Sequence, residues 1–206
     1  MKGILIGALT TLMVIFGFGG ASAQDTKAKY TAQQVYDFFE QYSPQDVVDH
    51  ARKAVEHFSK MSQKAATMTK NEEEEMFDKS LKEFHKIPLK FKWEKYPLIP
   101  FIVPQRCDEG RVVAHPITVF FKMMNEKGFI NKYRDVKGKK IGLSLCEKVK
   151  NSELAAWGMQ YQWWPQTDKP LNMGALMIAI PNSPYQVQAF YPTQKYSEEQ
   201  LNALLK

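Results

Sequence analysis

A long, one-sided apolar pattern near the N-terminus constrains the fold more than any other feature. Apolar residues recur at three- and four-residue steps from Val47 to Met68, the spacing of one face of an α-helix. Ser43 and Pro44 precede this pattern, and a serine N-cap followed by proline is a typical helix start. The pattern predicts one helix of more than 20 residues, which is long for a globular domain.

Shorter helices are expected on both sides of it. Thr31 and Gln34 form a capping-box pattern, which an apolar face follows at Val35, Phe38, Phe39 and Tyr42. Glutamates 72–75 lie in the first turn of another expected helix, where negative charge complements the helix dipole. We prefer this interpretation to a calcium site, because the alternating oxygen ligands and central glycine of a calcium loop are missing. The helical part covers residues 31–86.

After Lys86 the pattern changes from helical to extended. Prolines break any helix, and short β-prone runs are bounded by turn residues. The expected strands are 98–103, 111–114, 159–164, 175–180 and 186–191, with a turn over 165–172. Short helices are expected at 117–127, 141–149 and 197–206. Helices followed by a run of strands predict one α+β domain, with an antiparallel sheet in the region 87–192.

The first 23 residues carry the pattern of a secretory signal peptide. Lys2 gives a positive start, residues 4–20 are almost all apolar or small, and Ala21-Ser22-Ala23 fits the cleavage pattern. An uncleaved membrane anchor is the alternative, since the apolar run is near the lower limit for a spanning helix. We expect cleavage before Gln24 and a bacterial periplasmic location. The mature chain, 24–206, is expected to have no membrane span.

Charge and cysteine content limit the partners and suggest one covalent bond. Lys2 is the only charged residue of the expected signal peptide, so the remaining chain has a net charge of about +5. No run of basic residues tracks a phosphate backbone, so nucleic acid is not an expected partner. Cys107 and Cys146 are an even pair in an oxidising compartment, which favours a disulfide over a reactive thiol or metal pair. Its loop would stabilise the fold by roughly 4 kcal/mol.

Three stretches then follow one another in a particular order: CDEGRVVAHP at 107–116, DVKGK at 135–139 and YQWWP at 161–165. Together, after a signal peptide, they resemble the single Cache domain, an extracytoplasmic sensor module. The resemblance covers about Ser43 to Tyr196. It implies a PAS-like fold, in which the long helix packs behind an antiparallel sheet of five to six strands. Loops on the other face cover a pocket, which in the family commonly binds carboxylates or amino acids.

Two departures from the family change what we expect. No second membrane helix or signalling domain follows, so we expect a stand-alone form that holds a small organic ligand. It would pass its message to a membrane receptor or another periplasmic protein. The lysine and tyrosine that face the ligand in the family fall at Met173 and Leu176. The pocket is therefore expected to be more apolar than usual, or absent.

The expected ligand-binding residues are mostly aromatic. In a strand, Tyr161 and Trp163 project from one face, and Gln162 and Trp164 from the other. Aromatic side chains with a polar group suit a binding site, but they are equally good core material. An arginine supplies a cation for an acidic ligand, and a histidine at a strand end either lines the pocket or satisfies backbone groups. The predicted set is Arg106, His115, Tyr161, Trp163, Trp164 and Tyr191.

The sequence shows no pattern of catalysis or metal binding. A Ser-His-Asp set, a paired-carboxylate motif, a phosphate-binding glycine loop and a metal-ligand cluster are all missing. We therefore expect a non-enzymatic periplasmic protein that binds a small molecule, without a cofactor or metal. The alternative is a protein–protein interaction module whose pocket is filled by its own side chains. The apolar run LNMGALMIAI at 171–180 favours this alternative.

Overall fold

The structure is a computed structural model that describes residues 28–86, 102–116, 118–150, 154–164 and 167–206. The expected signal peptide, residues 1–23, lies outside the described residues, as does most of the expected strand at 98–103. Of the described helices, none is both long enough and apolar enough to cross a bilayer.

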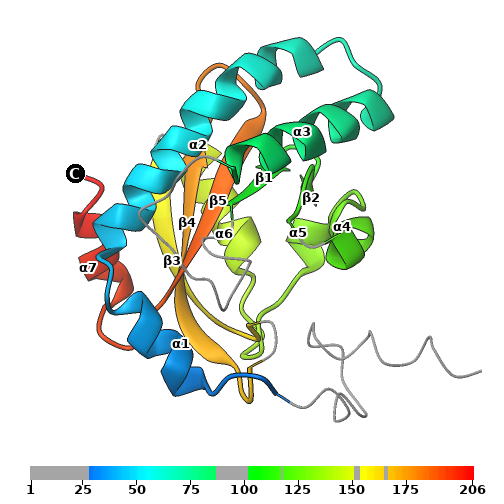
Figure 1. Cartoon of the computed structure of the whole chain (residues 1–206). Coiled ribbons are helices and arrows are strands. Elements are labelled where there is room, and N and C mark those ends of the chain that lie inside the picture. The colour runs from blue at the N-terminus through cyan, green and yellow to red at the C-terminus, as the bar shows by residue number, and fades with distance from the viewer. Residues whose placement is uncertain (1–27, 87–101, 117, 151–153, 165–166) are drawn as a thin grey trace, which may run out of the picture.

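Three helices form the N-terminal part, as the sequence predicts. They are α1 (Ala32–Phe39), α2 (Pro44–Ala65) and α3 (Lys70–Phe84). Each begins at a capping box, in which the side chain of Thr31, Ser43 or Thr69 accepts a hydrogen bond from the backbone three residues later. The long helix α2 has 22 residues, and α3 folds back beside it (Figure 1).

A five-stranded antiparallel sheet follows, with the strand order β2-β1-β5-β4-β3. Its strands are β1 (Ile102–Arg106), β2 (Arg111–Val112), β3 (Ala155–Gln162), β4 (Leu171–Ala179) and β5 (Tyr185–Pro192). This confirms the predicted α+β class and the five to six strands. Four more helices are short: α4 (Thr118–Met124), α5 (Phe129–Lys132), α6 (Ile141–Lys150) and α7 (Glu198–Ala203).

Strands β3 and β4 begin earlier than the sequence predicts. The predicted starts were 159 and 175, but Ala155 and Leu171 are already in the sheet. The added residues include alanine and glycine, which are weak strand formers, so local propensity gives no signal there. They are strands because β3 and β4 pair along their whole length, with Gly158 opposite Ala175. The predicted turn over 165–172 therefore ends before Leu171.

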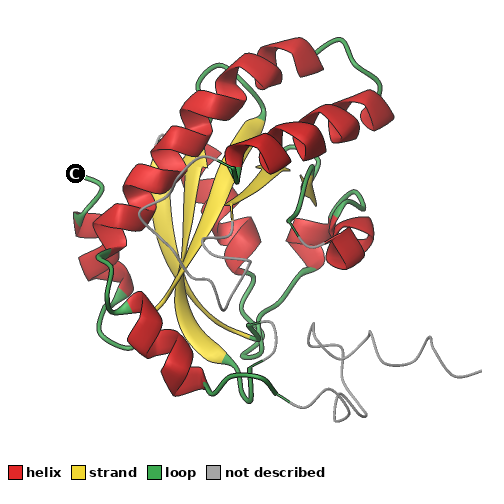
Figure 2. Ribbon diagram, viewed as in Figure 1, coloured by secondary structure: helices red, strands yellow, loops and turns green. Residues whose placement is uncertain are grey.

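Helices cover both faces of the sheet (Figure 2). We call one face the α2 face; its strand residues Trp157, Leu176, Val187 and Ala189 belong to the same core cluster as the apolar side of α2. The opposite face, the α6 face, carries Ala156, Ala175 and Met177, which pack with α6 in a smaller cluster. Because side chains alternate along a strand, the register assigns every other strand residue to one of these two faces.

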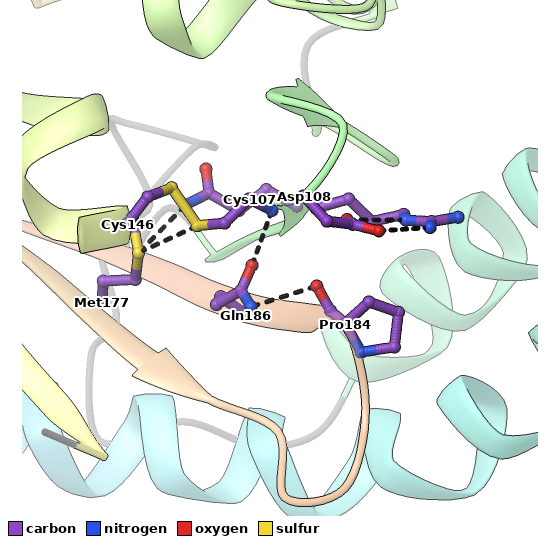
Figure 3. The surroundings of a disulfide bond; sticks show 8 residues. Cys107, Asp108, Cys146, Met177, Pro184 and Gln186 are labelled. Atoms are coloured by element: carbon purple, nitrogen blue, oxygen red, sulfur yellow. Dashed lines mark hydrogen bonds and ion pairs between the residues drawn. A yellow bond between two sulfur atoms is a disulfide. The ribbon is translucent and has the colours of Figure 1, made fainter. Parts of the chain in front are cut away.

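One covalent bond ties the α6 face together. Cys107, in the turn after β1, forms a disulfide with Cys146 of α6, which confirms the predicted pair (Figure 3). The backbone N–H of Cys107 donates to Oε1 of Gln186 at 2.9 Å, and Met177 Sδ lies 3.7 Å from Cys107 Sγ. The disulfide therefore links α6 to the β1–β2 hairpin across the edge of the sheet.

Candidate functional site

The structure does not bring the six predicted site residues together. Arg106, Tyr161 and Tyr191 lie at strand positions on the α2 face, by alternation with Trp157 and Val187. Trp164 follows the end of β3, and its buried ring packs edge-on against Phe39 of α1. His115 and Trp163 are half-buried in the segments that follow β2 and β3. The prediction that residues 161–164 alternate within one strand is wrong beyond Gln162, where β3 ends.

Arg106 is held by carboxylates of the protein itself. Its guanidinium forms ion pairs with Asp108 at 2.6 Å, with Glu109 at 3.0 Å and with Glu73 at 3.4 Å. The hydrogen bonds that Arg106 donates to the Asp108 carboxylate are the main reason that the pKa of Arg106 is raised. An acidic ligand would have to displace one of these partners, so Arg106 is not an open cation site.

The cluster around Arg106 continues into the core. Arg111 and Glu73 are both almost fully buried and form an ion pair, and the Tyr185 hydroxyl donates to the same Glu73 carboxylate. Burial raises the pKa of Tyr185, and the bond to Glu73 raises it further. Arg111 also donates to Asn125 Oδ1 at 3.0 Å. These contacts tie α3 to β2, β5 and the end of α4, which is a structural task on the α2 face.

Tyr191 and Tyr161 also have structural partners. The buried Tyr191 hydroxyl donates to the carbonyl of Tyr42 at 2.9 Å and to that of Phe39 at 3.3 Å. It thereby satisfies carbonyls at the C-terminal end of α1. Tyr161 is half-buried, and the Lys137 ammonium lies 4.5 Å from the centre of its ring. Its backbone N–H donates to Asp135 Oδ2 at 2.9 Å.

The α6 face has a different character, because its described strand positions are all uncharged. Five of them are glutamines: Gln105, Gln160, Gln162, Gln186 and Gln188. The other positions are apolar or small, namely Val103, Val112, Ala156, Gly158, Leu171, Met173, Ala175, Met177, Ala179, Phe190 and Pro192. A sheet face that combines apolar side chains with a few amides has the composition of a small-molecule site.

Three of these glutamines have side-chain partners. Gln186 accepts from the Cys107 backbone and donates to the Pro184 carbonyl at 3.0 Å (Figure 3). Gln105 Nε2 lies 3.4 Å from Met177 Sδ. Gln162 is hydrogen-bonded to the Tyr133 hydroxyl, whose pKa is raised chiefly by burial. These amides hold the hairpin, the disulfide region and the segment after α5 in place.

Gln160 differs from the other three. The residue is only 7% exposed, and no group of the described residues forms a hydrogen bond with its amide, whose atoms stay within reach of solvent. Gln188 on β5 is half-buried and has no such partner among the described residues either. Gln160 lies directly opposite Met173, the position at which the Cache family commonly has its ligand-facing lysine.

Part of the α6 face is filled by the helix that covers it. Gly158 faces α6, and a Cβ at this position would lie 3.3 Å from Ile141 Cγ2 and 3.4 Å from Leu145 Cδ2. The missing side chain lets α6 approach the sheet closely. Gln160 lies one pleat further along β3 on the same face.

The sequence analysis predicted neither the charged cluster around Glu73 nor the row of glutamines on the α6 face. The glutamines carry a signal that was available, since Gln160 and Gln162, and again Gln186 and Gln188, are two residues apart and so share a face of a strand. Glu73 carries no comparable signal, because the first-turn position explains it equally well. Within the described ranges, no group of three or more His, Cys, Asp and Glu side chains is placed to hold a metal.

Comparisons with known proteins agree with this architecture. No family model matches the sequence, and no curated protein matches it. A solved structure described as the periplasmic sensor domain of a chemotaxis protein matches with a TM-score of 0.51 and 14% identity, over 73% of this chain and 93% of that one. A second, described as a Cache chemosensory domain that recognises carboxylic acids, has a TM-score of 0.48 and 12% identity, over 80% of this chain and 100% of that one. The chain has a Cache-like fold.

Proposed function

We propose that this protein is a periplasmic sensory or accessory protein that binds a small organic molecule on the α6 face of its sheet. The observation that carries the proposal is Gln160, a largely buried residue whose amide is within reach of solvent and has no hydrogen-bond partner among the described residues. Its place on the sheet face opposite the long helix agrees with the pocket side of a Cache-like fold. A ligand that reaches this amide would find its donor and its acceptor unused by the described residues.

The chemistry of the face favours an uncharged, hydrogen-bonding ligand. An amide both donates and accepts, so it suits groups such as amides, alcohols and ring nitrogens. A buried carboxylate would need a compensating cation, and the described strand positions of this face supply none. Arg106, the predicted cation, is paired on the other face. His115 and Trp163 remain proposed contributors, because both are half-buried outside the regular strands.

The alternative function is an interaction module without an open pocket. The close packing of α6 favours it, since a Cβ at Gly142 would lie only 2.9 Å from Ile130 Cγ2, tighter than the 3.3 Å at Gly158. In that case the α6 face would be a second core, and partner proteins would use the outer surface.

A thermal-shift panel on the purified, oxidised protein separates these functions. It should contain neutral amides, polyols and nucleosides in one group, and organic acids and amines in two others. We expect a dose-dependent rise in Tm for members of the neutral group, because a ligand that binds only the folded state stabilises it. A rise for acids alone would contradict the proposed ligand class. The absence of any rise would contradict the binding function and favour the interaction module.

A further inference from the structure

The outer edge of β3 combines two properties that rarely occur together. β3 is the last strand in the sheet order, so one of its sides has no neighbouring strand. Its sequence, AAWGMQYQ, contains no charged residue and no proline. Charge and proline are the usual means by which proteins prevent an edge strand from pairing with another chain. This edge must therefore be protected in another way.

Side chains take the place of a neighbouring strand. The backbone N–H of Trp157 donates to Asn202 Oδ1 at 2.9 Å, and Asn202 Nδ2 donates back to the Trp157 carbonyl at 3.1 Å. The N–H of Met159 donates to Glu198 Oε2 at 3.1 Å. Glu198 and Asn202 both belong to α7, which lies beside β3 (Figure 1).

The far end of the edge is closed by a turn. Asp135 accepts from the N–H of Tyr161, and the Val136 N–H donates to the Tyr161 carbonyl at 2.9 Å. The backbone N–H groups of Trp157, Met159 and Tyr161 point away from β4, and each of them donates a hydrogen bond to a side chain. Two of these three side chains belong to α7. α7 therefore acts as a cap on the edge.

Few contacts hold this cap in place. α7 has six residues, of which Leu201 is buried against Trp157 and Gly174. One partly exposed ion pair, between Lys148 and Glu198 at 2.8 Å, joins it to α6. Such pairs contribute at most about 1 kcal/mol. A helix this short depends on its packing to exist at all, so the contacts of Glu198 and Asn202 with β3 also hold the helix itself in place.

Exposed apolar side chains lie along the same edge of the sheet. Among the described residues, the exposed large hydrophobic side chains are Leu154 (72% exposed), Val136 (43%) and Leu204 (37%). Leu154 directly precedes β3, Val136 pairs with the far end of β3, and Leu204 follows the last turn of α7. Leu154 and Val136 thus lie at the two ends of an uncharged edge strand, where a partner that pairs along the strand would cover both.

We propose that this edge is a self-association surface, which α7 closes and whose partner is β3 of a second copy. Antiparallel pairing of two identical strands is isologous, so each copy offers the same surface to the other. The uncharged sequence places no like charges opposite each other. A two-fold axis near the middle of β3 would bring Leu154 of each copy toward the Val136 turn of its partner. Two exposed apolar side chains would thereby be buried at each end.

The test removes the cap without removing its buried anchor. The double variant Glu198→Ala, Asn202→Ala leaves Leu201 in place, and Glu199→Ala on the exposed side of α7 is the matched control for the loss of charge. Light scattering after size exclusion gives the mass of the full chain over a range of concentrations. We expect the double variant to associate at a concentration at least tenfold lower than the wild type or the control. Equal masses at all concentrations would overturn the proposal.

A third substitution shows which surface the copies use. Met159→Lys, added to the double variant, puts a charge in the middle of β3, and we expect it to restore the wild-type mass. Association that persists in this triple variant would overturn the proposal, because it would not involve the β3 edge. Near-ultraviolet circular dichroism checks that each variant is folded. If the double variant is unfolded, Asn202→Ala alone makes the same test at Trp157, and an unchanged mass would again overturn the proposal.

Discussion

The two faces of the sheet use polar side chains in opposite ways. On the α2 face, charges are paired: the buried Glu73 with the buried Arg111, and the half-buried Arg106 with the exposed Asp108. On the α6 face, the described strand positions carry no charge, and the amide of Gln160 has no partner among the described residues. Charge pairing on the α2 face contributes to stability, although the indole N–H of Trp157 on that face is buried without a partner among the described residues. On the α6 face, an unpaired amide within reach of solvent is available to a partner outside the chain.

The faces also differ in how they are packed. The α2 face holds the large aromatic side chains of the core, including Phe39, Phe58, Phe77 and Trp157. The α6 face has a smaller cluster, built largely from aliphatic side chains of α6 and small residues of β3 and β4. The difference predicts that substitutions on the α2 face change stability, whereas those on the α6 face change binding.

The largest effect is expected from Arg111→Leu. This substitution leaves the Glu73 carboxylate buried without its main partner, and breaking a buried ion pair from one side costs about 3–5 kcal/mol. Urea denaturation measures the free energy of unfolding. Lys82→Ala, which removes the exposed pair with Asp78, is the control, and its cost should be below about 1 kcal/mol. Similar costs for the two variants would contradict the assignment of the Glu73–Arg111 pair to the core.

A smaller effect is expected from acidification, through His50 on α2. Burial is the main reason that the pKa of His50 is lowered to about 4 in the folded protein. The unfolded chain therefore binds this proton first, so the contribution of His50 is complete above about pH 6.5 and is lost as the pH falls to about 4. The loss amounts to at most about 3 kcal/mol.

The variant His50→Leu isolates this contribution from those of other titrating groups. We expect its free energy of unfolding, measured by urea denaturation at pH 7, 5.5 and 4, to fall less than that of the wild type. Parallel curves for the two proteins would show that His50 does not titrate in this range.

Two glycines on neighbouring strands allow the packing of the two faces to be compared directly. At Gly174 of β4, a Cβ would lie 2.7 Å from Leu201 Cδ1 and 3.0 Å from the Trp157 ring, on the α2 face. At Gly158, the nearest atoms are 3.3–3.5 Å away, on the α6 face. Overpacking costs about 1–3 kcal/mol, so Gly174→Ala should lower stability by this amount and Gly158→Ala by less than about 1 kcal/mol. Thermal unfolding ranks the two, and a larger cost at Gly158 would reverse the comparison.

The sequence predicted the features that depend on local signals. The capping residues Thr31 and Ser43 mark helix starts whatever the tertiary structure, and the spacing of apolar residues determines the buried side of α2. The pairing of Cys107 with Cys146 followed from the compartment and the even count. The resemblance to the Cache domain gave the order of the elements, and with it the sheet of five strands.

The site depends on tertiary contacts that the sequence does not encode locally. Tyr191 and Trp164 are aromatic residues that suit a pocket and a core equally well, and only the packing against α1 decides between them. Arg106 became a structural residue because Asp108 and Glu109 turn back toward it. The glutamine pattern was visible at 160 and 162, but its meaning depended on knowing which face α6 covers.

Gln160→Met tests the central claim most directly. Methionine keeps the length of the side chain and removes the amide, while Gln33→Met on the exposed surface of α1 is the matched control. Calorimetric titration with the compound that gives the largest thermal shift measures the affinity of both variants. We predict that Gln160→Met weakens binding at least tenfold and leaves Tm unchanged or raised, because it removes an amide that forms no hydrogen bond with the described residues. Wild-type affinity in Gln160→Met would contradict a ligand site on the α6 face.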